Sequence, residues 1–353
     1  MIPTMTNVYE SLPPSAYWRS AVVDSGPFGL AGLIQPKFQV TRDLAVATAG
    51  SCFAQHVGRA LRGAGLAVLD VEPAPPGLDA DSAKRFGFGL YSGRYGNIYT
   101  TRQLRQLLQD VSQPQIRAEA IWTRDGRYFD ALRPSVEPDG CDSAVEVMQL
   151  RAFHLARLAK MLAQCELFVF TLGMTESWVD ADTGTVFPSA PGVLADPPPT
   201  AKVTFCNFTF AEVLADLTAA RALLLTFNPA MRMILSVSPV PLTATASSRH
   251  VLVATSASKA ILRAVVDEFA RNKPDVDYVP SYEIITNPAA KGRFFAANLR
   301  SVTQEGVDLV MAHFLHAHDL APLPTAAAPT VPAMENESDD LICEEALVEA
   351  FRK

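Results

Sequence analysis

The segment Gly50-Ser51-Cys52-Phe53-Ala54 has the residue types of a turn that presents a nucleophile. It follows an apolar, β-prone run and precedes a helix-like segment over Gln55–Ala64. A strand, a tight turn and a helix expose a side chain at the carboxyl edge of a sheet, and the helix amino terminus offers backbone N–H groups to a developing oxyanion. Two nucleophiles are adjacent here, the Ser51 hydroxyl and the Cys52 thiol. A thiol at a helix start can be activated, but a small cysteine there commonly packs in the core, which we expect of Cys52.

Small or polar residues also follow three other apolar runs. These segments are Gly173 to Trp178, Ser236 to His250 and Pro280 to Glu283. In a parallel sheet the carboxyl ends of the strands lie at one edge, where ligands bind. The sequence therefore predicts one site built from all four segments.

The elements that would position this site alternate along the chain. Five apolar runs without polar alternation suit strands that are covered on both faces. They are Leu44–Ala49, Leu66–Val71, Leu167–Leu172, Met231–Val237 and Val276–Val279. Helical patterns separate or follow them at Gln55–Ala64, Arg102–Gln109, Ala144–Gln164, Ala211–Phe227, Ser256–Asn272 and about Gln304 to His316. This alternation predicts an α/β fold, a three-layer α/β/α sandwich with a mainly parallel sheet.

The composition divides the chain into three parts. Residues 1–40 are rich in Pro and Gly and predict an irregular leader whose aromatic side chains pack on the domain. Residues 41–320 form the α/β domain, with an insertion at about 72–142 that either shapes a substrate pocket or only packs as an appendage. Residues 321–353 change to Pro, Ala and Thr and then to acid, which predicts a disordered linker. Its end, Leu341–Phe351, is a short acidic amphipathic pattern that either docks on a protein partner or on the domain, or frays.

Charge and composition exclude several classes of protein. The net charge of −7 argues against a nucleic-acid-binding protein. Five scattered cysteines predict a reduced, cytoplasmic protein. No apolar stretch has the roughly 18 residues of a membrane span, and the first residues lack a secretory signal. We expect no metal, because His313, His316 and His318 have no matching carboxylates. We expect no nucleotide cofactor either, because Gly87 and Gly89 lack the third glycine of a dinucleotide fingerprint.

The sequence resembles a known family. Residues 50–54 spell the signature after which the GSCFA family is named, and the resemblance covers about residues 40–316. Other blocks that look like those of the family follow in order: Tyr95–Tyr99, Phe170–Trp178, Ser238–Pro241, Ser258-Lys259, Pro280–Glu283 and Arg300 to Met311. The family is placed with the SGNH/GDSL-like hydrolases. The resemblance thus implies a flavodoxin-like sandwich and an esterase or acyltransferase, with a carbohydrate ester among the candidate substrates.

The resemblance also implies roles for single residues. Ser51 matches the nucleophilic serine, and its own N–H would be one oxyanion donor. Gly173 and Thr175 fall near the block that normally carries an oxyanion-hole asparagine, which is absent there. Asn207 lies in Phe205-Cys206-Asn207-Phe208, which resembles another block, and is a further candidate donor.

The general base is where the chain departs from the family. Asn298-Leu299-Arg300-Ser301 stands where an Asp-x-x-His is expected. A serine needs a base within hydrogen-bond reach. By elimination among six histidines, the prediction is His250, oriented by Glu283 or Glu176 as in other triads. His56, five residues after Ser51, is the weaker candidate.

The sequence thus predicts a serine-dependent hydrolase or acyltransferase that needs no cofactor and acts on a small-molecule or glycan ester. The missing Asp-x-x-His leaves open a non-catalytic protein that binds a ligand or a partner on the same fold. Attack by Cys52 in place of Ser51 is the third alternative.

Overall fold

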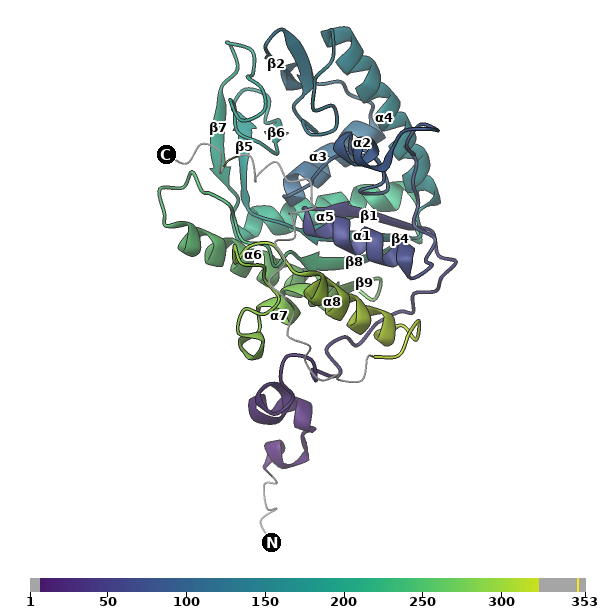
Figure 1. The fold of residues 1–353 in the computed structure, drawn as a ribbon, viewed down its shortest axis with the longest axis vertical. Helices are drawn as coiled ribbons and strands as arrows, with labels where there is room; N and C mark the ends of the chain where they lie inside the picture. Colours follow the sequence, from purple (N-terminus) through teal and green to yellow (C-terminus); the bar gives the residue numbers. More distant parts are fainter. Residues whose placement is uncertain (1–6, 324–347, 349–353) are drawn as a thin grey trace.

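The computed structural model describes residues 7–323 and residue 348. Of the predicted tail pattern Leu341–Phe351, all but Val348 lies outside the described residues. At the centre of the fold is a four-stranded parallel sheet of order β1-β4-β8-β9 (Figure 1). Its strands are β1 (Val46–Gly50), β4 (Leu167–Leu172), β8 (Arg232–Val237) and β9 (Val276–Val279).

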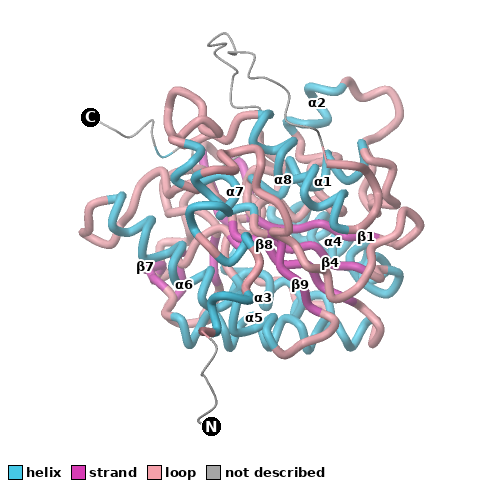
Figure 2. The backbone as a smooth tube through the Cα atoms, turned by 90° about the horizontal axis from the view of Figure 1, so that it is seen from below, coloured by secondary structure: helices cyan, strands magenta, loops and turns pink. Residues whose placement is uncertain are grey.

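Helices cover both faces of this sheet, as Figure 2 shows. Strand residues alternate between two apolar clusters: Val46, for example, belongs to one and Ala47 to the other. The first cluster joins the sheet to α1 (Phe53–Gly63), α7 (Ser281–Thr286) and α8 (Gln304–Ala317). The second joins it to α3 (Thr101–Ser112), α4 (Ala144–Gln164), α5 (Phe210–Phe227) and α6 (Val251–Arg271). The predicted three-layer α/β/α sandwich is confirmed.

The predicted strand Leu66–Val71 is wrong. Only a single parallel bridge, Val68 to Val46, links this segment to the edge of the sheet. Leu69 N–H still donates to Val46, but Val71 N–H already donates to Ser92 O. The segment therefore pairs with β1 over too few residues to form a strand. Its apolar side chains still cover the edge of the sheet at Val46.

The segment between β4 and α5 contains a second sheet that the sequence analysis did not predict. It is antiparallel, with order β6-β5-β7. The strands are β5 (Glu176–Asp180), β6 (Val186–Phe187) and β7 (Val203–Asn207). A hairpin of β2 (Ile121–Arg124) and β3 (Arg127–Asp130) lies close by in the upper part of Figure 1. These strands are short and partly exposed, and such runs give little apolar signal in a sequence.

The leader behaves in two ways. Phe28 packs against Phe294 with ring centroids 5.7 Å apart, and Phe38 lies under the guanidinium of Arg232. By contrast, Trp18 is 65% exposed, and the short helices at Val8–Ser11, Pro14–Ala16 and Arg19–Val23 project away from the body in Figure 1. Packing on the domain is therefore right for the second half of the leader only.

The strand register brings the carboxyl ends of the strands level. Gly50 pairs with Thr171, Thr171 with Ser236, and Ser236 with Val279. The segments that follow these residues therefore start at one edge of the sheet, as predicted. None of the helices in the described ranges combines the length and hydrophobicity that crossing a bilayer requires.

Candidate functional site

Ser51 lies between β1 and α1, in a turn that only glycine permits at its first position. Gly50 has φ +142°, and a Cβ there would be 2.4 Å from Thr171 O. Beyond the turn, the N–H groups of Ala54 and Gln55 donate to the carbonyls of Ser51 and Cys52 and start α1. The close approach of β1 to β4 therefore fixes where the Ser51 side chain lies.

The Ser51 hydroxyl is buried and has no hydrogen-bond partner among the described residues. The residue is 2% exposed. Gly173 closes over it from β4: a Cβ on Gly173 would be 2.7 Å from Ser51 Cβ. Leaving a buried hydroxyl unpaired costs about 1–3 kcal/mol, so such groups are rare and often mark functional positions.

The expected oxyanion donors are already bonded within the fold. Ser51 N–H donates to Thr171 O at 3.1 Å and Gly173 N–H to Tyr99 O at 2.9 Å. Thr175 N–H donates to Ser258 Oγ at 3.0 Å. The prediction that the N–H of Ser51 is an available donor is therefore wrong for this conformation, because the β1–β4 hydrogen-bond ladder extends one residue past Gly50.

The insertion at about 72–142 helps to build the site. Tyr91 donates its hydroxyl hydrogen to the Asn97 carboxamide oxygen at 2.6 Å and also lies 3.0 Å from Ser51 O. Gln55 Nε2 donates to the same Asn97 oxygen at 3.2 Å, and Ile98 N–H donates to Gly50 O. The insertion thus packs against the turn that holds Ser51, and its shaping of a substrate pocket stays a prediction.

Helix α6 supplies a residue to which the sequence analysis gave no role. Lys259 is 2% exposed, and its Nζ donates to Gly173 O at 2.6 Å. Together with Ser258 it fixes the chain that follows β4. The signal was present in the sequence: Lys259 stands three and seven residues before the buried Leu262 and Val266, on the apolar face of the helix.

Thr175 and Asn207 are brought together as predicted site residues. Thr175 Oγ1 donates to Asn207 Oδ1 at 2.7 Å. The contact follows from the pairing of β5 with β7, in which Glu176 lies opposite Asn207. Asn207 is exposed, and no described residue accepts a hydrogen bond from its Nδ2.

His250, Glu283 and Glu176 are not brought together. His250 is exposed and caps α6, with its Nδ1 accepting from Leu252 N–H at 3.2 Å. Glu176 instead accepts from the hydroxyl of Thr245 at 2.7 Å. The predicted histidine is thus used as a helix cap, and no hydrogen bond joins it to Ser51 or to either carboxylate.

Glu283 is held by its own neighbours. Arg263 Nε binds one carboxylate oxygen, and Tyr278 donates its hydroxyl hydrogen to the other at 2.6 Å. Burial and the Glu283 charge raise the pKa of Tyr278, so this phenol remains a donor. Glu283 therefore bonds Arg263 and Tyr278 in this structure, and no hydrogen bond between described residues joins it to His250.

The Asn298–Ser301 segment forms a closed turn. Asn298 Oδ1 accepts from the N–H groups of Arg300 and Ser301, and its Nδ2 donates to Ser301 Oγ at 2.9 Å. Leu299 has φ +54°. An amide and a hydroxyl thus occupy the place that the resemblance gives to an acid and a base.

The remaining nucleophile and base candidates lie along α1. Cys52 is 3% exposed and belongs to an apolar cluster with Val57 and Val302, which fits the packing role expected of it. His56 is 9% exposed, with its ring 5.9 Å from that of Phe53. In the described ranges, no group of three or more His, Cys, Asp or Glu side chains could hold a metal ion.

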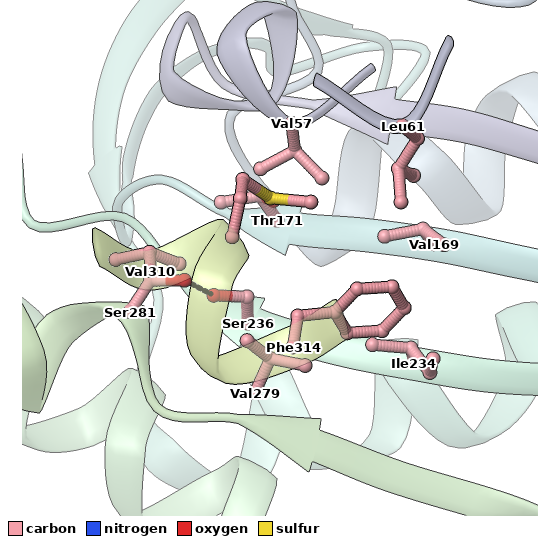
Figure 3. Close-up of a pocket in the computed structure, with 11 residues that line it drawn as sticks. Val57, Leu61, Val169, Thr171, Ile234, Ser236, Val279, Ser281, Val310 and Phe314 are labelled. Carbon is pink, nitrogen blue, oxygen red and sulfur yellow. Dashed lines mark hydrogen bonds between the residues drawn. The ribbon is translucent and has the colours of Figure 1, made fainter. Parts of the chain in front are cut away.

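A small internal cavity of about 20 Å³ lies on the α1 and α8 side of the sheet (Figure 3). Its walls are mainly apolar side chains such as Val57 and Phe314. On one wall Ser236 Oγ donates to Ser281 Oγ at 2.7 Å, whereas Thr171 Oγ1 has no partner among the described residues. With so few polar groups, the cavity gives Ser51 neither a base nor an oxyanion donor.

A comparison of the sequence with models of known protein families shows to which family the chain belongs. The sequence model of the GSCFA family matches residues 45–314. The chain belongs to the GSCFA family. The matched range runs from the residue before β1 into α8, so it contains Ser51, Gly173, Lys259 and the Asn298–Ser301 turn. No curated protein matches the chain, so the family membership does not by itself assign an activity.

Proposed function

We propose that this GSCFA protein hydrolyses or transfers an acyl ester, with the Ser51 hydroxyl as nucleophile. The observation that carries the proposal is the unpaired Ser51 Oγ, buried at the carboxyl end of β1 beneath Gly173. The resemblance of the sequence to the SGNH/GDSL-like hydrolases points to the same reaction. Packing alone gives no reason to keep a hydroxyl there, since alanine would fill nearly the same space without an unsatisfied group.

The chemistry has two steps. Ser51 Oγ forms a bond to the acyl carbonyl carbon, the ester C–O bond breaks, and the alcohol leaves with the proton from Ser51. Water or a second alcohol then attacks the acyl-serine, which returns the proton to Ser51 and releases an acid or a new ester. We propose Asn207 Nδ2, which donates to no described residue, as the side-chain donor for the oxyanion. Removing a single oxyanion donor elsewhere costs about 10²–10³ in kcat.

A non-catalytic binding protein is the second candidate. It is favoured by the absence of any hydrogen bond to Ser51 Oγ among the described residues and by the Asn298–Ser301 turn in place of an acid and a base. In that case the same edge of the sheet would hold an ester or an alcohol without turning it over.

Active-site labelling separates the two candidates. We expect a fluorophosphonate probe to modify the wild-type protein and not Ser51→Ala, together with turnover of a short-chain aryl ester that only Ser51→Ala abolishes. Ser236→Ala is the matched control, because Ser236 is also a buried strand-end serine but has a hydrogen-bond partner. Absence of both labelling and turnover in the wild type would favour the binding protein.

Attack by Cys52 is tested with the same assay. We expect Cys52→Ala to retain the turnover of the wild type, and iodoacetamide to leave that turnover intact. Loss of activity in Cys52→Ala with full activity in Ser51→Ala would transfer the nucleophile to the thiol.

A further inference from the structure

An open pocket of about 200 Å³ lies beside the chain that follows β4. Met174 lines it and directly follows Gly173, which lies against Ser51. The pocket extends over β5 and β7 to the loop after β8, and Val348 also lies on its wall.

One wall of the pocket is aromatic. Trp178 on β5 and Phe205 on β7 are directly opposite one another in the register. Their ring centroids are 5.8 Å apart at 69°, and both rings are half-buried. Because the two rings are far from parallel, a ring-shaped ligand can pack on the face of one of them while the other borders it.

The polar side chains that line the pocket include no cation among the described residues. Glu176 is 7% exposed, and one carboxylate oxygen accepts from Thr245. Thr243 Oγ1 is buried without a hydrogen-bond partner among the described residues. No Lys, Arg or His is among the described residues that line the pocket, which argues against an anionic ligand.

We propose that this pocket binds a neutral, polyhydroxylated ring, such as a saccharide unit. The aromatic wall would cover the C–H face of the ring, while Glu176 and Thr243 would bond its hydroxyl groups. A role for the ring as the alcohol part of the ester, or as the acyl acceptor, rests on the proposed function. A quaternary ammonium ligand also suits aromatic rings and a carboxylate, and the titration below distinguishes it from a neutral ring.

Calorimetric titration of the full chain with methyl glucopyranoside and methyl galactopyranoside tests the proposal. We expect measurable binding of at least one glycoside. Trp178→Ala should weaken it about tenfold or more, in line with the loss of a central aromatic contact. Trp18→Ala is the matched control because Trp18 is exposed on the leader. If Trp178→Ala fails to fold, Thr243→Val and Glu176→Gln replace it, and each should weaken binding.

Three outcomes would overturn the proposal. They are no binding of either glycoside, binding that is unchanged in all the pocket variants, and binding of tetramethylammonium in preference to the glycosides. Comparing glycoside binding with ester turnover separates this inference from the proposed function. We expect Ser51→Ala to bind the glycoside like the wild type. Glycoside binding without any ester turnover in the wild type would retain the pocket and remove the esterase. Ester turnover that depends on Ser51, without glycoside binding, would retain the esterase and remove the saccharide pocket.

Discussion

Two buried serines at the ends of strands in the same sheet have opposite environments. Ser236, near the end of β8, donates to Ser281 Oγ at 2.7 Å. Ser51, directly after β1, has no hydrogen-bond partner among the described residues, and Gly173 is in contact with its Cβ. Burial is nearly equal, with 3% of Ser236 and 2% of Ser51 exposed. The difference shows that equally buried serines of one sheet can differ in whether their hydroxyls are paired.

Substitution of Gly173 should have the largest effect on this comparison. In Gly173→Ala the added methyl would lie 2.7 Å from Ser51 Cβ, so the turn must move, and overpacking of this kind costs about 1–3 kcal/mol. We expect this loss in the free energy of unfolding from urea denaturation, together with loss of ester turnover. Gly63→Ala is the control, because a Cβ there meets nothing within 4 Å. Equal stability of the two variants would contradict the tight contact.

Substitution of Lys259 should change the surroundings of Ser51 and not those of Ser236, because its Nζ bonds Gly173 O. In Lys259→Met, Gly173 O loses its hydrogen bond from Nζ, which should lower the free energy of unfolding by about 1–3 kcal/mol. Ester turnover should fall as well. The control is Lys160→Met, because Lys160 is exposed on α4 and such changes stay within about 0.5 kcal/mol. A Lys259→Met protein that keeps wild-type stability and turnover would remove the residue from the site.

The buried pair of Glu72 and His154, the latter on α4, should make stability depend on pH. His154 Nδ1 lies 2.7 Å from Glu72 Oε2, and His154 Nε2 has no hydrogen-bond partner among the described residues. Burial, together with the charges of Arg133 and Arg151, lowers the pKa of His154 to about 4. Burial alone would raise the pKa of Glu72, but His154, Arg133 and Arg94 N–H bring it down to about 2.

Both groups bind protons more readily in the unfolded chain. The free energy of unfolding should therefore fall as the pH drops from about 6.5 to about 4 through His154, and fall further below about 4.5 through Glu72. The His154 share between pH 7 and pH 5 is about 1–2 kcal/mol. Urea denaturation at the two pH values measures it, and His154→Gln should flatten the change. An unchanged slope would assign it to His313 and His318, whose pKa values burial also lowers.

The two serines themselves should give the smallest and most direct contrast. Ser236→Ala breaks the bond to Ser281 and should cost about 1 kcal/mol of unfolding free energy. Ser51→Ala removes an unpaired buried hydroxyl and should leave stability unchanged or slightly raised. Thermal unfolding of both variants measures the difference. A larger loss in Ser51→Ala would show that Ser51 has a structural partner after all.

Much of the fold could be predicted from the sequence, because buried parallel strands and amphipathic helices have strong local patterns. Leu167–Leu172, Val276–Val279 and Ala144–Gln164 match β4, β9 and α4 in full. Strands β5 and β7 gave no comparable signal, since their stability comes from pairing with each other and from packing on the hairpin side. Leu66–Val71 gave the signal of a strand but not the structure, because only Val68 meets a partner strand.

For the site, the sequence by itself determined the strand–turn–helix that holds Ser51, the carboxyl edge at which the polar segments meet, and the lack of an Asp-x-x-His. These follow from residue types and spacing within a few residues. Only the tertiary structure decided that Ser51 Oγ is unpaired, that its N–H is bonded to Thr171, and that Lys259 holds Gly173. It also decided that His250 caps a helix and that Glu283 is held by Arg263 and Tyr278. Each of these depends on which polar groups become neighbours when distant segments pack, and a hydrogen-bond partner of that kind has no signature in the local sequence.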